Sequence, residues 1–159
     1  MAANGTLPEV PLLGDYPAQP HPESRKGGRR AQEVSGTSAA PFPSVSIVTI
    51  VRNGVRTLPR TLDSVLSQDF LDIEYVIVDG GSTDGTLDLL QANQNRIALW
   101  ISEADRGISD AFNKGIALSR GEIIGLINGD DWYEPGAVRA IVAEMQRTGA
   151  DIACGGLQY

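Results

Sequence analysis

The stretch Val45–Val51, which reads Val-Ser-Ile-Val-Thr-Ile-Val, decides the fold of this chain. Its β-branched residues are typical of a strand that is buried on both faces. Similar apolar runs recur at 73–78, 97–102 and 122–127. A strand buried on both faces needs helices on both sides of its sheet, so the sequence between these runs should be helical.

Segments with helical spacing of apolar residues do separate the predicted strands. The first of them, 57–68, places Leu58, Leu62 and Val65 three or four residues apart, with Pro59 in its first turn. Further helices are expected at 86–94, 109–119 and 135–147. Strands that alternate with helices predict an α/β fold, with right-handed crossovers and a mostly parallel sheet flanked by helices.

The chain divides into two regions of different composition. Residues 1–43 are rich in Pro, Gly, Ser and Ala and show no strand or helix period, so we expect a disordered leader. Residues 44–159 are expected to form one folded domain. Near its end, 151–154 is expected to begin another strand, with Cys154 as a small core residue.

Charge and hydropathy exclude several kinds of partner. The formal net charge of −7 argues against a nucleic-acid or anionic-membrane surface, because phosphates attract Lys and Arg. An acidic chain can still bind a phosphate that is bridged by a metal ion. No apolar run approaches the roughly 20 residues of a membrane span. A lone cysteine and the lack of a signal peptide favour the reducing cytoplasm.

Polar residues follow each predicted strand, at the edge where parallel sheets bind their ligands. These strand-end segments are Arg52-Asn53-Gly54, 79–86, 102–107 and Asn128-Gly129-Asp130-Asp131. Carboxylates outnumber basic residues among them. Unpaired carboxylates repel one another, so this edge predicts a bound cation or a ligand rich in hydrogen-bond donors.

Each candidate residue also has a structural interpretation. Asp130 and Asp131 either serve a divalent ion and a ligand hydroxyl, or form a polar turn before the next helix. Asp79 either accepts hydrogen bonds from a base or ribose, or stabilises its own turn. Arg106 either contacts phosphate or pairs with a neighbouring acid. Asp84 is expected to cap the next helix.

Two further groups of residues are expected to be structural. Asp110, Asn113 and Lys114 share the spacing of a solvated helix surface. Trp132 and Tyr133 follow the acid pair and are interpreted as packing residues, with a sugar pocket as the alternative.

Five motifs in fixed order resemble the family 2 glycosyltransferases, which have the GT-A fold, a Rossmann-like sheet flanked by helices. They are Val45 to Asn53, Thr61 to Gln68, Val78 to Thr86, Asp105 to Gly115 and Gly121 to Asp131. The resemblance covers essentially the whole of the folded region. It also implies that the chain is truncated after its metal-binding motif.

The resemblance assigns roles to individual residues. It implies that Asp131 contacts the metal, Mg²⁺ or Mn²⁺, and that Asp130 lies near the ribose or sugar. It also implies that Asp79 binds the nucleotide and that Val51 and Asn53 border the base. Arg106 is implied to lie close to the donor pocket. Many members carry two acids after the second strand, whereas this chain has Gly80 in the second place.

The implied activity is transfer of a sugar from a nucleoside diphosphate donor, most often a UDP-sugar, to a sugar or lipid-linked acceptor hydroxyl. Polysaccharide or glycoconjugate synthesis is the expected setting. No residue of this chain is a convincing catalytic base, so a donor-binding module without an acceptor site is the alternative. An acid-rich phosphatase or receiver domain is disfavoured, because the first strand ends in Arg52-Asn53 instead of an Asp nucleophile.

Overall fold

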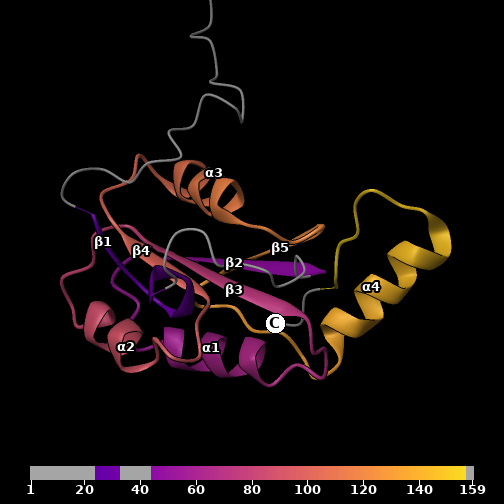
Figure 1. Cartoon of the computed structure of the whole chain (residues 1–159), viewed down its shortest axis with the longest axis horizontal. Coiled ribbons are helices and arrows are strands. Elements are labelled where there is room, and N and C mark those ends of the chain that lie inside the picture. Colours follow the sequence, from indigo (N-terminus) through magenta and orange to yellow (C-terminus); the bar gives the residue numbers. More distant parts are fainter. Residues whose placement is uncertain (1–23, 33–43, 157–159) are drawn as a thin grey trace, which may run out of the picture.

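The computed structural model describes residues 24–32 and 44–156, and these form a five-stranded sheet in the order β1-β4-β3-β2-β5 (Figure 1). Four strands are parallel: β2 (Val45–Val51), β3 (Ile73–Asp79), β4 (Leu99–Ser102) and β5 (Ile123–Asn128). The short strand β1 (Arg25–Gly27) joins the edge of β4 antiparallel.

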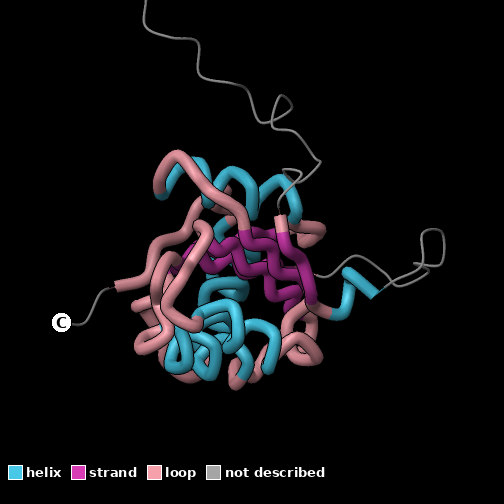
Figure 2. Tube along the Cα trace, turned by 90° about the vertical axis from the view of Figure 1, so that its left-hand side faces the viewer, coloured by secondary structure: helices cyan, strands magenta, loops and turns pink. Residues whose placement is uncertain are grey.

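Helices cover both faces of this sheet (Figure 2). They are α1 (Leu58–Leu66), α2 (Thr86–Ala92), α3 (Ile108–Leu118) and α4 (Ala137–Thr148). Residues of α1, α2 and α4 pack in one core cluster with alternate residues of the strands. The opposite cluster joins Ala111 of α3 to Val48 and Val76 of the sheet. All seven residues of β2 are buried, which confirms the predicted α/β sheet flanked by helices.

The expectation of disorder throughout 1–43 is wrong for residues 25–32. Residues 25–27 form β1, and Arg29–Gln32 forms one turn of 3-10 helix. A three-residue strand is too short to show a period, so the sequence pattern missed it. It is held by main-chain pairing with β4 and by packing: a Cβ on Gly27 would lie 2.5 Å from the ring of Trp100. The rest of the expected leader lies outside the described residues.

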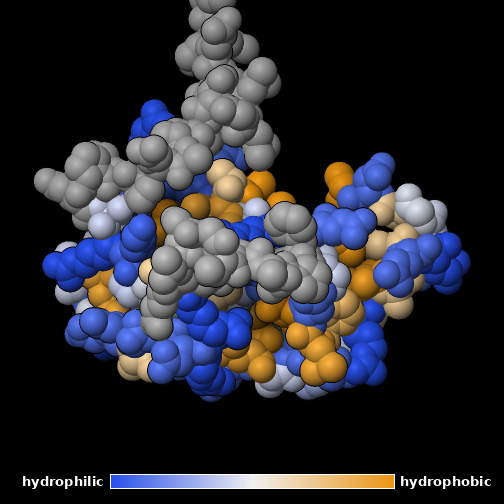
Figure 3. All heavy atoms as spheres, viewed as in Figure 1, coloured by the Kyte–Doolittle hydropathy of each residue, from blue (hydrophilic) through white to orange (hydrophobic). Residues whose placement is uncertain are grey.

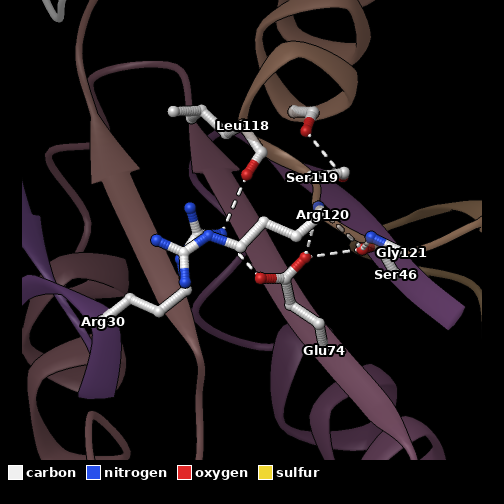
Figure 4. A network of polar contacts seen from close by, with 8 residues as sticks. Arg30, Ser46, Glu74, Leu118, Ser119, Arg120 and Gly121 are labelled. Carbon is white, nitrogen blue, oxygen red and sulfur yellow. Dashed lines mark hydrogen bonds and ion pairs between the residues drawn. The ribbon is translucent and has the colours of Figure 1, made fainter. Parts of the chain in front are cut away.

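Arg30 fastens this segment to the amino end of the sheet (Figure 4). Its guanidinium donates to Glu74 Oε1 at 2.7 Å and to the carbonyl of Leu118, at the end of α3, at 2.8 Å. The other carboxylate oxygen of Glu74 accepts from the Ser46 hydroxyl at 2.5 Å and from the Arg120 amide at 2.8 Å. Glu74 is only 5% exposed, so the pair is largely removed from water. It lies at the sheet end opposite to the acid-rich loops.

The expected strand at 151–154 is not formed. Residues 151–156 carry no strand and are all exposed. Cys154 is therefore exposed and is not the core residue that was expected. An apolar triplet such as Ile152 to Cys154 becomes a strand only where a neighbouring strand offers main-chain partners, and none of the described strands does so here. Among the described helices, none has the length and apolar character needed to cross a bilayer.

Candidate functional site

The parallel pairing brings the carboxyl ends of four strands to one edge of the sheet. Val51 is level with Asp79, and Asp79 is level with Ser102. Asn128 at the end of β5 is level with Ile50, one residue before the end of β2. The loops that follow these strands therefore meet at one edge, as the sequence predicted.

Asp79 lies at the centre of this edge and is fully buried. Its Oδ2 accepts from the amides of Gly81 and Ser82, at 3.1 and 2.9 Å, and from the Ser102 hydroxyl at 2.6 Å. Its Oδ1 accepts from the Ser82 hydroxyl. The carboxylate is thus occupied by its own loop and by β4, which corresponds to the turn-stabilising interpretation.

The loop after β2 is tied to the loop after β3. Asn53 has a left-handed φ of 53°, which asparagine tolerates better than most residues. Its amide donates to Ser82 Oγ at 2.7 Å, and its side-chain oxygen accepts from the Thr83 amide at 2.9 Å. The next amide, that of Gly54, donates to Thr86 Oγ1 at 3.0 Å. Asn53 therefore lies beside the Asp79 loop, and Val51 is buried at the end of β2.

Asp84 completes this connection at the start of α2. Its Oδ1 accepts from the amide and the hydroxyl of Thr86, at 3.0 and 2.5 Å, so it satisfies a free donor of the first turn, although the N-cap residue is Gly85 and not Asp84 as expected. Its Oδ2 accepts from the Val55 amide at 3.1 Å. The hydrogen bond from the Thr86 side chain is the main reason that the pKa of Asp84 lies below its ordinary value.

Arg106 follows β4 and is 83% exposed. Its main-chain amide donates to Asp110 Oδ2 at 3.0 Å, and its guanidinium lies 3.5 Å from Asp110 Oδ1. Asp110 is buried and is also 3.3 Å from Lys114, so the expected solvated surface is wrong for Asp110. Lys114 reaches Glu103 at 2.9 Å. Burial alone would lower the pKa of Lys114, but Glu103 and Asp110 outweigh it and the pKa is raised.

The acid pair after β5 is exposed to solvent. Asn128 orients Asp131, because its side-chain amide donates to Asp131 Oδ2 at 3.1 Å. The Thr61 hydroxyl of α1 donates to the main-chain oxygen of Asp131 at 2.7 Å, which fixes the loop. No three His, Cys, Asp or Glu side chains of the described chain lie close enough to form a complete metal site.

The two aromatic residues after the acid pair have different environments. Tyr133 packs against the core cluster on the α1 face, and burial raises its pKa. Trp132 is 41% exposed, and the Arg60 guanidinium lies 3.2 Å from the centroid of its ring. Packing therefore accounts for Tyr133, whereas Trp132 stays partly exposed beside Asp131 in the chain, with its indole N–H donating to Glu134 Oε1 at 3.3 Å.

Two features of this edge were not predicted. A Cβ on Gly80 would lie 2.2 Å from Asp105 Oδ2, so the Asp105 carboxylate fills the space beside Gly80. A side chain at position 80 would therefore require the Asp105 carboxylate to move. The second feature is a pocket of about 230 Å³ that is lined in part by Arg25. Neither was visible in the sequence, because each depends on residues that only the folded sheet brings together.

Comparison with known sequences agrees with this geometry. The sequence model described as glycosyl transferase family 2 matches residues 46–159. Chondroitin synthase of Escherichia coli is 36% identical over 129 residues, which are 79% of this chain and 18% of that protein. Hyaluronan synthase of Pasteurella multocida is 35% identical over 106 residues, which are 65% of this chain and 11% of that protein. The chain thus spans less than a fifth of the length of these two relatives.

Solved structures agree with the fold. TarS of Staphylococcus aureus, in complex with UDP-GlcNAc, is similar with a TM-score of 0.59 and 20% identity. That match covers 73% of this chain and 37% of the TarS 1–349 chain. A mannosyltransferase of Pyrobaculum calidifontis, in complex with GDP-Man and Mn²⁺, gives a TM-score of 0.56 at 24% identity, over 64% of this chain and 31% of that protein. These matches support the GT-A fold. With its sequence motifs, its fold and the family match in agreement, the chain belongs to glycosyl transferase family 2.

Proposed function

We propose that this chain forms the donor-binding part of a glycosyltransferase that acts in polysaccharide or glycoconjugate synthesis. Its ligand is a nucleoside diphosphate sugar, most often a UDP-sugar, and the sugar passes to a hydroxyl of a sugar or lipid-linked acceptor. The observation that carries this proposal is the convergence of four strand-end loops on one edge, with an exposed acid pair after β5. Membership of family 2 and the polysaccharide synthases among the relatives support it.

The acid pair suits Mg²⁺ or Mn²⁺, which prefer hard oxygen ligands. Asp131 would hold the metal, with its carboxylate oriented by the Asn128 side chain, and Asp130 would face the ribose or sugar. Both ions also accept phosphate oxygens and water as ligands, so a diphosphate could share the ion with Asp131. A bound metal ion supplies neutralisation of the charge that develops on the departing diphosphate. The Mn²⁺ and GDP-Man of the mannosyltransferase complex support this assignment.

The nucleotide would lie across the loops after β2, β3 and β4. Asp79 would act there as a positioning residue, because its carboxylate holds the loop at Gly81 and Ser82. Asn53, and Val51 before it, would border the base, since Asn53 lies against that loop. Arg106 would serve the donor pocket; its side chain stays 83% exposed in its pair with Asp110, and exposed pairs contribute little.

Calorimetric titration with UDP and GDP tests this function. We expect binding that is about tenfold or more tighter with Mn²⁺ than with a chelator, since phosphate binding at an acidic edge needs the cation. Asp131→Ala should reduce affinity to the metal-free level, whereas Asp88→Ala, which removes an exposed acid of α2, should not. Equal affinity with and without metal would refute the metal assignment. Absence of binding by either nucleotide would refute the donor-binding function itself.

A further inference from the structure

Arg25 lies at the carboxyl end of the sheet although it is among the earliest of the described residues. It pairs with Ser102, the last residue of β4. Residues directly opposite in an antiparallel pair point to the same face of the sheet. Ser102 donates to Asp79, so Arg25 stands one strand further out on the same face as this central contact. Lys26, opposite Ile101, stands on the other face.

A pocket opens at this position, between β1, β4 and α2. Its volume is about 230 Å³. Its lining residues are Arg25, Gly81, Ser82, Leu87, Ser102, Glu103 and Ala104. Figure 1 shows β1 beside β4 at the end of the molecule where α2 lies, and hydrophilic residues gather at this end in Figure 3. The pocket therefore borders the Asp79 loop directly.

Among the residues that line this pocket, Arg25 carries the charged group that a ligand can contact. Its side chain is exposed, and no described residue forms a hydrogen bond or ion pair with it. The carboxylate of the lining, Glu103, is 9% exposed and is paired with Lys114. The two lining hydroxyls, those of Ser82 and Ser102, both donate to Asp79. A ligand in the pocket would thus meet a free guanidinium, which binds an acceptor oxygen strongly.

The position of the pocket indicates which part of a nucleotide it would take. Neighbouring strands are about 4.8 Å apart, so β5 and β4, which are three steps apart in the sheet, are separated by roughly 14 Å. An extended nucleoside diphosphate can bridge such a separation from its phosphates to its base. With the phosphates at the acid pair after β5, the base would reach β4, and Arg25 stands one strand further out and lines the same pocket as Ser102 of β4.

We infer that Arg25 extends the donor site, and that its guanidinium binds a carbonyl oxygen of the nucleobase. This inference rests on the proposed function and assigns a specificity-determining residue to it. Arg25 precedes the family match, which begins at residue 46, so the contact would come from outside the matched region. The short strand β1 thereby has a role in binding as well as in closing the sheet edge.

The test compares two neighbouring cations of β1 in the full chain. UDP is titrated with Mn²⁺ into the unaltered chain, Arg25→Ala and Lys26→Ala, and inorganic pyrophosphate is measured by its competition with UDP. Arg25→Ala should weaken UDP binding by about tenfold or more, because a charge-assisted hydrogen bond is lost, and should leave the inhibition constant of pyrophosphate unchanged. Lys26→Ala, a change of equal charge on the opposite face, should alter neither value by more than about twofold.

The outcomes separate this inference from the function on which it rests. UDP affinity that is the same in Arg25→Ala and Lys26→Ala overturns the role of Arg25 and leaves donor binding intact. Equal weakening of pyrophosphate and UDP in Arg25→Ala places the contact at the phosphates and overturns the base assignment. If pyrophosphate does not compete in the unaltered chain, the phosphates are not held as the inference requires. If the unaltered chain binds no UDP, both the proposed function and this inference are refuted.

Discussion

Replacing Asp79 with alanine tests whether one buried carboxylate holds the whole donor edge. The change removes the acceptor for two main-chain amides and for the hydroxyls of Ser82 and Ser102. The hydroxyls can rotate toward other acceptors, but the amides of Gly81 and Ser82 cannot. The buried amide of Ser82 is left without an acceptor, at a cost of about 1–3 kcal/mol, while the amide of exposed Gly81 can bind water, and the charge-assisted bond from Ser102 is lost as well. We therefore expect the free energy of unfolding to fall by about 3 kcal/mol.

Urea unfolding, followed by circular dichroism and by the fluorescence of buried Trp100, measures this loss. Asp79→Asn keeps one acceptor oxygen and should lose about half as much stability. Asp88→Ala is the matched control, because it removes an exposed acid from α2 and should change stability by less than about 0.5 kcal/mol. A loss below about 1 kcal/mol in Asp79→Ala would refute the reasoning, since the loop would then hold its conformation without the carboxylate.

Two further predictions concern the connections at either end of the sheet. Arg30→Ala breaks the buried pair with Glu74 and should lower the free energy of unfolding by about 3 kcal/mol, whereas Arg29→Ala, an exposed neighbour, should have little effect in the same urea assay. The pKa of Asp84 is lowered chiefly by the hydrogen bond that it accepts from the Thr86 side chain. The ionised carboxylate therefore stabilises the fold at a pH above 3.8, the ordinary pKa of Asp, and this stabilisation is lost as the pH falls through the lowered pKa of the folded state. Urea midpoints measured from pH 6 to pH 3 should therefore fall less steeply in Asp84→Ala than in the unaltered chain, and identical slopes would contradict this linkage.

The sheet and its helices were predictable because the spacing of apolar residues along the sequence indicates which side chains are buried. The run at Val45–Val51 is buried throughout, and the spacing of Leu58, Leu62 and Val65 matches the buried face of α1. The meeting of the strand-end loops followed from the same pattern, because parallel strands end at one edge. β1 was missed, since three residues that are held by main-chain pairing leave no periodic signal.

Side-chain partners were harder to predict than elements. Asp110 has the spacing of a surface residue, yet α3 places it against Lys114, and it is buried. The sequence supports two roles for Asp79 equally, binding of the ligand and stabilisation of its own turn. The folded loop shows that four hydrogen-bond donors of the protein already surround its carboxylate. Arg106 has an exposed side chain, so its position in the fold does not decide whether it contacts the donor. Its predicted role in the donor pocket is a matter for binding measurements.

The central claim is that the acid pair after β5 binds a divalent cation together with a nucleoside diphosphate. Electron paramagnetic resonance of Mn²⁺ measures this most directly, because the signal of free Mn²⁺ falls when the ion is bound. Two control mixtures, Mn²⁺ with UDP and Mn²⁺ with the unaltered chain, give the fall in signal expected from separate binding. We predict that the signal of Mn²⁺ with UDP and the unaltered chain together falls further than these two binary mixtures explain. This excess should be lost in Asp131→Ala. A signal equal to that expected from the binary mixtures, or an excess that persists in Asp131→Ala, would contradict the claim.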